Sequence, residues 1–206
     1  MGSDPSAVAR ASGRLSPADL MPLEQYARLR PEFRARVLAH KRERQLAVGP
    51  HCTWCFEDRL TIQYQVQEML RAERIFEPEG IAQELDAYNP LVPDGTNWKV
   101  TLLIEYPDPA ERRVALERLK GIEDRCWVQV AGHERVWAIA DEDLERENEE
   151  KTSAVHFLRF ELDASVRAAL RAGAALSVGI DHDHHRYSVD RVPDFVRTSL
   201  IGDLSA

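Results

Sequence analysis

Residues 51 to 75, HCTWCFEDRLTIQYQVQEMLRAERI, are the stretch around which we expect the rest of the chain to fold. Apolar residues recur in it at the spacing of one helical face, which indicates a helix with a buried side. That face consists of Ile62, Val66, Met69 and Leu70, and it is widened near its start by Phe56 and Leu60. We therefore predict one continuous helix from Phe56 to Ile75, packed on a sheet through this face.

The other side of the predicted helix is rich in long polar side chains. Buried polar groups must find hydrogen-bond partners, so this side indicates either an internal network between helix and sheet or a face that binds a ligand or a partner protein. The side chains concerned are Glu57, Thr61, Tyr64, Glu68, Arg71 and Glu73, with glutamines at positions 63, 65 and 67.

Length and composition indicate one soluble globular domain. The chain has 206 residues, 44% hydrophobic and 30% charged, which is enough for a single core. Residues 1–15 are small and polar and are expected to form a disordered tail, followed by a single α+β domain over residues 16–206. No apolar run approaches the roughly 20 residues that cross a bilayer, and the N-terminus lacks the apolar core of a signal peptide. The expected location is therefore cytoplasmic, without membrane association.

The charge balance argues against nucleic acid as a partner. The net charge is -8, which disfavours general affinity for a phosphate backbone. One segment, Arg28 to Arg44, holds seven Arg or Lys against two Glu and indicates either an anion-binding or RNA-binding face or a solvated helix face. The odd count of three cysteines argues against a secreted disulfide scaffold.

Helical patterns come first in the chain and strand patterns later. They predict an α+β fold with helices in the N-terminal half and a mostly antiparallel sheet of about five strands in the C-terminal half, packed on the one long central helix. Residues 141–150, with seven carboxylates and one Arg, are expected to form a solvated loop or short helix. The expected strands are 97–106, a hairpin over 126–140 that turns at Gly132-His133, 153–162 and 175–181.

Histidines cluster directly after the last expected strand, in the segment DHDHH at residues 181–185. Imidazole and carboxylate are common ligands of zinc, iron and manganese. In an extended segment His182 and His184 share one side, about 6.5 to 7 Å apart, so one ion can bind both after some bending. The alternative interpretation is a solvated polar loop without a metal.

Further ligands for such an ion would come from other elements. His156 lies on an expected core strand, where it is either a ligand or a buried histidine with a hydrogen-bond partner. Glu57 and Glu68 are eleven residues apart, so on one helix about 16 Å separates them and only one can join a mononuclear site. Glu68 is the first choice because Tyr64 and Arg71 lie one turn away. The predicted ligands are drawn from Glu57, Glu68, His156, His182 and His184.

Cys52 and Cys55 form a C-x-x-C pair at the start of the predicted helix. Free backbone N–H groups at a helix N-terminus stabilise a thiolate, so this spacing is compatible with a redox dithiol or half of a metal site. The βαβ context of a thioredoxin is absent, and Cys126 provides no clear second half. Two ordinary small residues at a helix cap are the alternative.

Four segments together resemble a bacterial family known as domain of unknown function 3501. The resemblance covers about residues 17 to 205. It implies an association with rubrerythrin-type di-iron proteins and with iron–sulfur proteins similar to heterodisulfide reductase subunits, and hence a redox or oxidative-stress context. The chain departs from the family pattern at Cys52 and Cys55 and in its additional histidines, where either His182 or His184 corresponds to the family histidine. The segments are GPHCTWCFEDRLTIQYQVQEMLRAERI, ELDAYNPLVPDG, KTSAVHFLRFEL and GIDHDHHRY.

Three functions are compatible with these features. The favoured hypothesis is a cytoplasmic accessory protein of a redox or oxidative-stress system, with one transition metal bound through His and Glu. The first alternative is a metal-free protein–protein interaction module that docks a partner through its polar helix and acidic loop. The second alternative is a dithiol oxidoreductase that uses Cys52 and Cys55. No complete catalytic motif decides between them.

Overall fold

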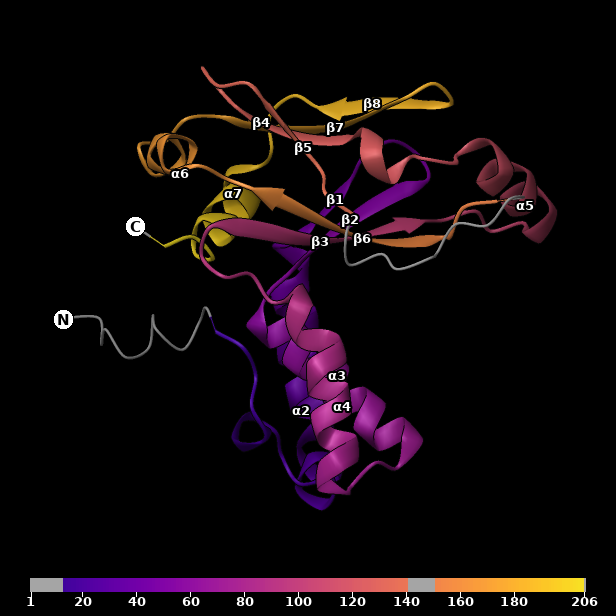
Figure 1. The fold of residues 1–206 in the computed structure, drawn as a ribbon, viewed down its shortest axis with the longest axis vertical. Helices are drawn as coiled ribbons and strands as arrows, with labels where there is room; N and C mark the ends of the chain where they lie inside the picture. The colour runs from indigo at the N-terminus through magenta and orange to yellow at the C-terminus, as the bar shows by residue number, and fades with distance from the viewer. Residues whose placement is uncertain (1–12, 141–150, 206) are drawn as a thin grey trace.

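The chain folds into two antiparallel sheets that stand on a lobe of helices (Figure 1). The computed structural model describes residues 13–140 and 151–205. The acidic run and most of the expected N-terminal tail, residues 1–12, lie outside the described residues. Leu15 is 4% exposed, and its backbone N–H and C=O both bond to the Asn89 side chain. The packed part of the chain therefore begins before residue 16.

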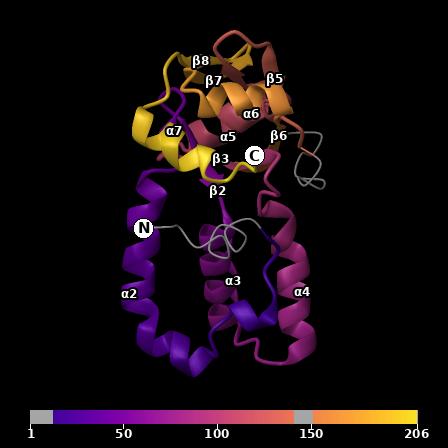
Figure 2. The same ribbon diagram turned by 90° about the vertical axis from the view of Figure 1, so that its left-hand side faces the viewer.

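Three helices form the helical lobe, with α3 lying between α2 and α4 (Figure 2). They are α2 (Leu23–Arg42), α3 (Arg59–Glu73) and α4 (Pro78–Tyr88), flanked by the short helices η1 (Pro17–Asp19) and η2 (Asn89–Leu91). Asp58 begins α3 as its N-cap, because its side chain accepts the Thr61 N–H. The apolar stripe of α3 is buried inside this lobe with Leu15, Leu85, Leu91 and Val92.

The strands form two four-stranded sheets, each antiparallel throughout. Sheet A has the order β1 (Gln45–Ala47), β2 (Cys52–Glu57), β3 (Asn97–Ile104) and β6 (Val155–Glu161). Sheet B has the order β5 (Arg135–Trp137), β4 (Cys126–Val130), β7 (Leu176–His182) and β8 (His185–Val189). Sheet A lies between sheet B and the helical lobe (Figure 1).

The two sheets face each other across one apolar core, and together with the remaining helices they form the sandwich. Inward-facing residues of both sheets, such as Trp54, Leu102 and Val178, are fully buried there. The sheets are joined at their margins by a bridge between Ile139 and Arg159 and by a hydrogen bond between His185 Nε2 and the Val48 carbonyl, 2.8 Å long. The ends are covered by α5 (Pro109–Arg118), α6 (Ala164–Arg171) and α7 (Asp194–Ile201), with η3 (Glu123–Arg125) before β4.

The α+β class is confirmed, and so is the alternation of the SAVHFLRFEL segment. His156, Leu158 and Phe160 are buried in the sandwich core, whereas the residues between them are only partly buried. The hairpin after residue 126 also turns where it was expected, with Gly132 at a φ of 85°. At this value only glycine avoids a steric penalty.

Three details of the predicted layout are wrong. Residues 52–57 form strand β2, so the helix begins at Arg59 and not at Phe56. The strands form two sheets and not one, and Gln45–Ala47 and Cys52–Glu57 add an unexpected hairpin to sheet A. The apolar stripe of α3 packs mainly within the helical lobe, where Ile62, Val66 and Leu70 share a cluster with α4 and the N-terminal segment, and Phe157 is the residue of sheet A that packs against this cluster.

We expect Val66→Asp to destabilise the helical lobe by about 3 kcal/mol or more, because an unpaired carboxylate would replace a fully buried apolar side chain. Urea denaturation followed by circular dichroism measures this loss. Gln65→Asp is the matched control, since Gln65 is the adjacent residue of α3 and is exposed. Equal stability of the two variants would show that the buried face of α3 has been assigned wrongly.

Candidate functional site

The two glutamates predicted as metal ligands lie in different environments. Glu57 ends β2 on the outer face of sheet A, where it accepts hydrogen bonds from Thr61 (2.5 Å) and Thr101 (2.7 Å). Glu68 lies within the helical lobe and accepts from the Tyr26 hydroxyl (2.6 Å) and from Arg30 (2.7 Å). The Arg30 hydrogen bond lowers the pKa of Glu68 to about 2 against the opposing effect of burial. Both carboxylates are thus held by protein groups.

The alternation of strands separates His156 from Glu57. His156 pairs across the sheet with Leu102, which pairs with Trp54, and these residues face the sandwich core. Glu57 lies on the opposite face of the same sheet. Within the core, His156 Nε2 lies 3.0 Å from both Thr152 Oγ1 and the Ser153 carbonyl oxygen. His156 is therefore a core histidine with partners, the alternative left open by the sequence.

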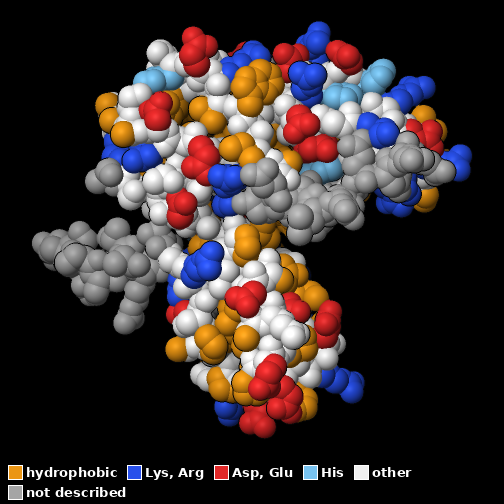
Figure 3. Space-filling model, viewed as in Figure 1, with side chains coloured by type: hydrophobic (Ala, Val, Ile, Leu, Met, Phe, Trp, Pro, Cys, Tyr) orange, Lys and Arg blue, Asp and Glu red, His pale blue; other side chains and the backbone are white. Residues whose placement is uncertain are grey.

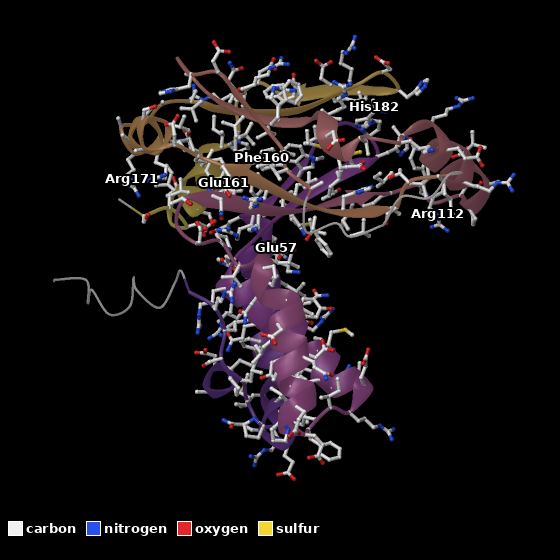
Figure 4. All side chains as sticks on the ribbon, in the orientation of Figure 1. Glu57, Arg112, Phe160, Glu161, Arg171 and His182 are labelled. Atoms are coloured by element: carbon white, nitrogen blue, oxygen red, sulfur yellow. The ribbon has the colours of Figure 1, made fainter. Side chains whose placement is uncertain are left out.

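His182 and His184 lie at the β7–β8 turn, in the other sheet. The solvated loop that was the alternative for His182 to His185 is instead a tight turn, and the chain continues from it into β8. His182 Nε2 lies 3.0 Å from the Lys120 carbonyl oxygen. Figure 4 shows His182 in the sheet B layer and Glu57 where sheet A meets the helical lobe. The five predicted ligands are therefore not brought together, and among residues 13–140 and 151–205 no three His, Cys, Asp or Glu side chains are grouped to hold a metal ion.

The cysteine pair does not have the geometry of a dithiol. Cys52 faces the sandwich core, whereas Cys55 lies on the outer face of sheet A beside Gln45. Residues three apart on a strand point to opposite faces, so the two sulfur atoms cannot form a disulfide. Burial raises the pKa of Cys52 to about 12 and that of Cys55 to about 11, which makes both poor nucleophiles.

The polar face of α3 forms an internal network. The Gln67 side chain accepts from the Met21 N–H (2.6 Å) and donates to the Met21 carbonyl (3.3 Å). Gln63 donates to the Asp19 carbonyl (2.5 Å). The glutamines join α3 to the N-terminal segment, and Glu68 joins it to α2. At the start of α3, Glu57, Thr61 and Thr101 join the helix to sheet A, in line with the internal network that was one of the two interpretations of this side. These glutamines are therefore consumed within the fold and are not available to dock a partner.

A different group of charged side chains gathers where the helical lobe meets the sandwich. Its centre is Arg44, between α2 and β1, which is 2% exposed. Its five N–H groups are directed at five acceptors. The acceptors are the carbonyls of Phe56 (3.0 Å), Glu57 (3.3 Å) and Ser199 (3.3 Å), the Ser199 hydroxyl (3.2 Å) and the Asp203 carboxylate.

His40 and Asp58 form a hydrogen-bonded pair beside Arg44. His40 lies in the last turn of α2, and its Nε2 is 2.5 Å from Asp58 Oδ2. The other carboxylate oxygen of Asp58 accepts the Thr61 N–H (2.9 Å), and Arg44 Nε lies 3.6 Å from Oδ2. Burial raises the pKa of Asp58, but the hydrogen bond from His40 and the charge of Arg44 outweigh burial and hold the pKa below its ordinary value. Because an ionised carboxylate only accepts, Nε2–H of His40 is the donor, and Nδ1 makes no hydrogen bond within the described residues.

Asp203, which follows α7, completes the cluster, and its pKa is shifted in the opposite direction from that of Asp58. Its burial raises the pKa to about 6, although the charge and hydrogen bond of Arg44 act in the other direction. Asp58 and Asp203 share Arg44 as their cation, but their pKa values shift in opposite directions. Asp58 is driven toward the ionised form and Asp203 toward the protonated form. Such divergence is typical of acid–base sites, although structural ion pairs also produce it.

These side chains line an open pocket of about 360 Å³, a volume suited to a small molecule. The pocket also receives Arg59 and Gln63 from the first turns of α3 and Ser199 from α7. Arg59 is bonded to Asp19 (2.5 Å) and Gln63 to the Asp19 carbonyl, so both are held in place. We name this hollow the junction pocket.

The junction pocket was not predicted from the sequence. One signal was available: Arg44 shares its alternation phase with Leu46 and Val48, and all three are buried while the residues between them are exposed. A charged residue in phase with a buried strand face indicates a buried cation that needs anionic partners. The partners Asp58 and Asp203 lie far along the chain, and no spacing connects them to Arg44.

Comparisons with known proteins identify relatives without an assigned activity. The family described as "Protein of unknown function (DUF3501)" matches residues 14–204. A solved structure, described as a novel protein of unknown function from Burkholderia pseudomallei K96243, is 53% identical with a TM-score of 0.89. It covers 94% of this chain and 100% of its own. The search of curated proteins finds no match. Within the part of the chain that the structure describes, no helix has the length and apolarity to cross a membrane.

Replacing Arg44 with methionine should destabilise the protein by about 3 to 5 kcal/mol, because two largely covered carboxylates and several carbonyls would lose their cation. Arg44→Lys should restore only part of this, since an ammonium group has three donors in a different geometry. Arg42→Met is the matched control, because Arg42 is exposed in the last turn of α2. Thermal and urea denaturation measure all three, and an Arg44→Met protein as stable as the control would contradict the role of Arg44.

The raised pKa of Asp203 leads to a pH-dependent prediction. A carboxyl with a higher pKa in the folded state contributes stability below its ordinary pKa of 3.8 and loses that contribution as the pH rises through about 6. We therefore expect Asp203→Asn, which cannot titrate, to gain stability relative to the wild type between about pH 4 and about pH 7. Urea denaturation across this range measures the difference, with the exposed Asp190→Asn as control. A constant difference for Asp203→Asn would contradict the assignment.

Proposed function

The chain belongs to the DUF3501 family, and we propose that it binds a small polar molecule in the junction pocket and exchanges a proton with it. The reaction class is general acid–base catalysis, in which a positioned side chain gives or takes a proton from the bound molecule. The proposal rests on the side chains of this pocket alone, because the description of the family assigns no chemistry.

One observation carries the proposal: an imidazole held by an ionised carboxylate shares a pocket with a carboxyl group whose pKa is about 6. Asp58 fixes the orientation of the His40 ring through Nε2 and leaves Nδ1 for a ligand. Asp203 engages Arg44 through Oδ2, and its other oxygen makes no hydrogen bond within residues 13–140 and 151–205. Each group thus offers one atom to the pocket.

The roles follow from these contacts. His40 is the proton acceptor, since an imidazole oriented by a carboxylate is a common general base. Asp203 is the proton donor, because a carboxyl with a pKa near 6 is partly protonated close to neutral pH. Asp58 and Arg44 are positioning residues: Asp58 acts through His40, and Arg44 has no N–H left for a ligand.

A screen of small polar compounds tests this function. Nuclear magnetic resonance with 15N-labelled histidine should identify carboxylic acids, amides or alcohols whose binding shifts the ring signals of His40. Their affinity should fall by about tenfold or more in His40→Gln and Asp58→Asn. His184→Gln is the control, because His184 is exposed in the turn between β7 and β8. Ligands that bind the His40→Gln protein as tightly as the wild type would contradict the proposal, as would a screen in which no compound shifts His40.

The redox role implied by the family resemblance remains a prediction, with its transition metal and its rubrerythrin-type or iron–sulfur partners. One contact bears on the metal: the rings of His182 and His184 lie 5.9 Å apart, centroid to centroid, at the β7–β8 turn. Two imidazoles on a surface turn hold a transition metal weakly without a third ligand. The junction pocket therefore has the stronger claim as the functional site.

A further inference from the structure

A second hollow, lined almost entirely by apolar side chains, lies at the tip of the helical lobe. We name it the tip groove. It has a volume of about 490 Å³ and lies between the segment that leads into α2 and the turn that joins α3 to α4. Its apolar lining includes Leu20, Met21, Leu23, Ile75, Phe76 and Ile81.

Phe76 is the residue of this groove whose large apolar side chain contributes little to the packing of the fold. Its side chain is 69% exposed, the largest value among the exposed large apolar side chains of the described residues. The turn is firmly built around it: Arg74 ends α3 in the left-handed region at a φ of 59°, and Ile75 packs against Gly80 so closely that a Cβ there would lie 2.7 Å from Ile75 Cγ2. A rigid turn thus presents a large aromatic ring to solvent beside an open apolar groove.

The rim of the tip groove is acidic. Residues 73–79 contain three glutamates and one arginine, and Glu24 lines the groove from α2. Glu73 ends α3, where a negative charge opposes the helix dipole, so helix stability does not account for it. Burial and then the charge of Glu73 raise the pKa of Glu84 on α4, so the carboxylates of Glu73 and Glu84 lie close enough to repel each other. Figure 3 shows acidic side chains beside apolar ones at this end.

We propose that the tip groove docks a basic, amphipathic helix of a partner protein, with a large apolar side chain of that helix beside Phe76. The chemistry of the partner follows from charge complementarity: lysines or arginines that flank an apolar stripe meet the glutamates of the rim, while the stripe fills the groove. An anionic membrane surface does not fit, because the same glutamates would repel it. The tip groove and the junction pocket lie at opposite ends of α3, so docking leaves the pocket open.

The experiment uses a synthetic helix-forming peptide of about 18 residues, with leucine at one helical face and lysine elsewhere. Isothermal titration calorimetry measures its affinity for the full chain, and backbone amide signals locate it. Binding should shift the signals of Ile75, Phe76 and Ile81 and should weaken by about tenfold or more in Phe76→Ala. The double variant Glu77→Lys with Glu79→Lys should weaken binding and reduce its dependence on salt. Phe195→Ala is the matched control, because Phe195 is 58% exposed on α7 in the sandwich.

Three outcomes would overturn the proposal. The first is equal binding of a peptide with the same composition in scrambled order, which would indicate attraction to the net negative charge alone. The second is equal affinity of the Phe76→Ala and wild-type proteins for the peptide. The third is a concentration-dependent dimer in sedimentation that Phe76→Ala dissolves, which would assign the groove to a second copy of this chain. Circular dichroism should show both groove variants to be folded, since the replaced side chains are exposed.

Discussion

A guanidinium group shut away from water must find an acceptor for every N–H, and Arg44 does so by holding three parts of the chain together. Its acceptors are the backbone at the end of β2, the last turn of α7 and the carboxylate of Asp203. The end of β2 is also where α3 begins, so the same contacts hold the point at which the helical lobe leaves sheet A. A buried ion cluster of this kind gives no large net stability compared with apolar packing, but it penalises every arrangement in which one partner is missing. The junction between the lobe and the sandwich is therefore held by charge pairing beside apolar contacts such as that of Phe157.

The limits of prediction from the sequence are clearest in the stretch that organises the fold. The helix, its polar face and its apolar stripe are all present in α3, but residues 52–57 belong to β2. Phe56 and Leu60 have helical spacing, and this spacing extended the predicted helix backward. The competing signal was the alternation of Cys52, Trp54 and Phe56 after a Gly-Pro turn, which is that of a strand with one buried face. Local periodicity identifies such an element, but the boundary between two adjoining patterns is decided by tertiary contacts.

The candidate site was harder to predict from the sequence than the fold, for a physical reason. The metal hypothesis grouped residues by their side-chain type and by their position near the ends of helices and strands. It did not take into account that residues of one sheet can lie on opposite faces of it. His156 on β6 and Glu57 on β2 both lie on strands that pair with β3, yet alternation directs His156 into the sandwich core and Glu57 to the opposite face of sheet A. The residues that do converge, Arg44, Asp58 and Asp203, come from distant segments with no motif between them. Only the burial phase of Arg44 could have indicated such a convergence from the sequence.

The two ends of α3 differ in the side chains that they leave available for binding. Along its length the helix consumes its own polar groups: Gln63 and Gln67 bond to the backbone of the N-terminal segment, and Glu68 is neutralised by Arg30. At its N-terminus the fold concentrates charge, and the burial that raises the pKa of Asp203 leaves a proton available near neutral pH. At its C-terminus charge of one sign surrounds an apolar hollow. A polar helix that is internally satisfied is a rigid spacer, so a partner held at the tip and a small molecule held at the junction would keep a fixed separation. Such a division suits a protein that works beside another one, because docking and chemistry then place no conflicting demands on the same side chains.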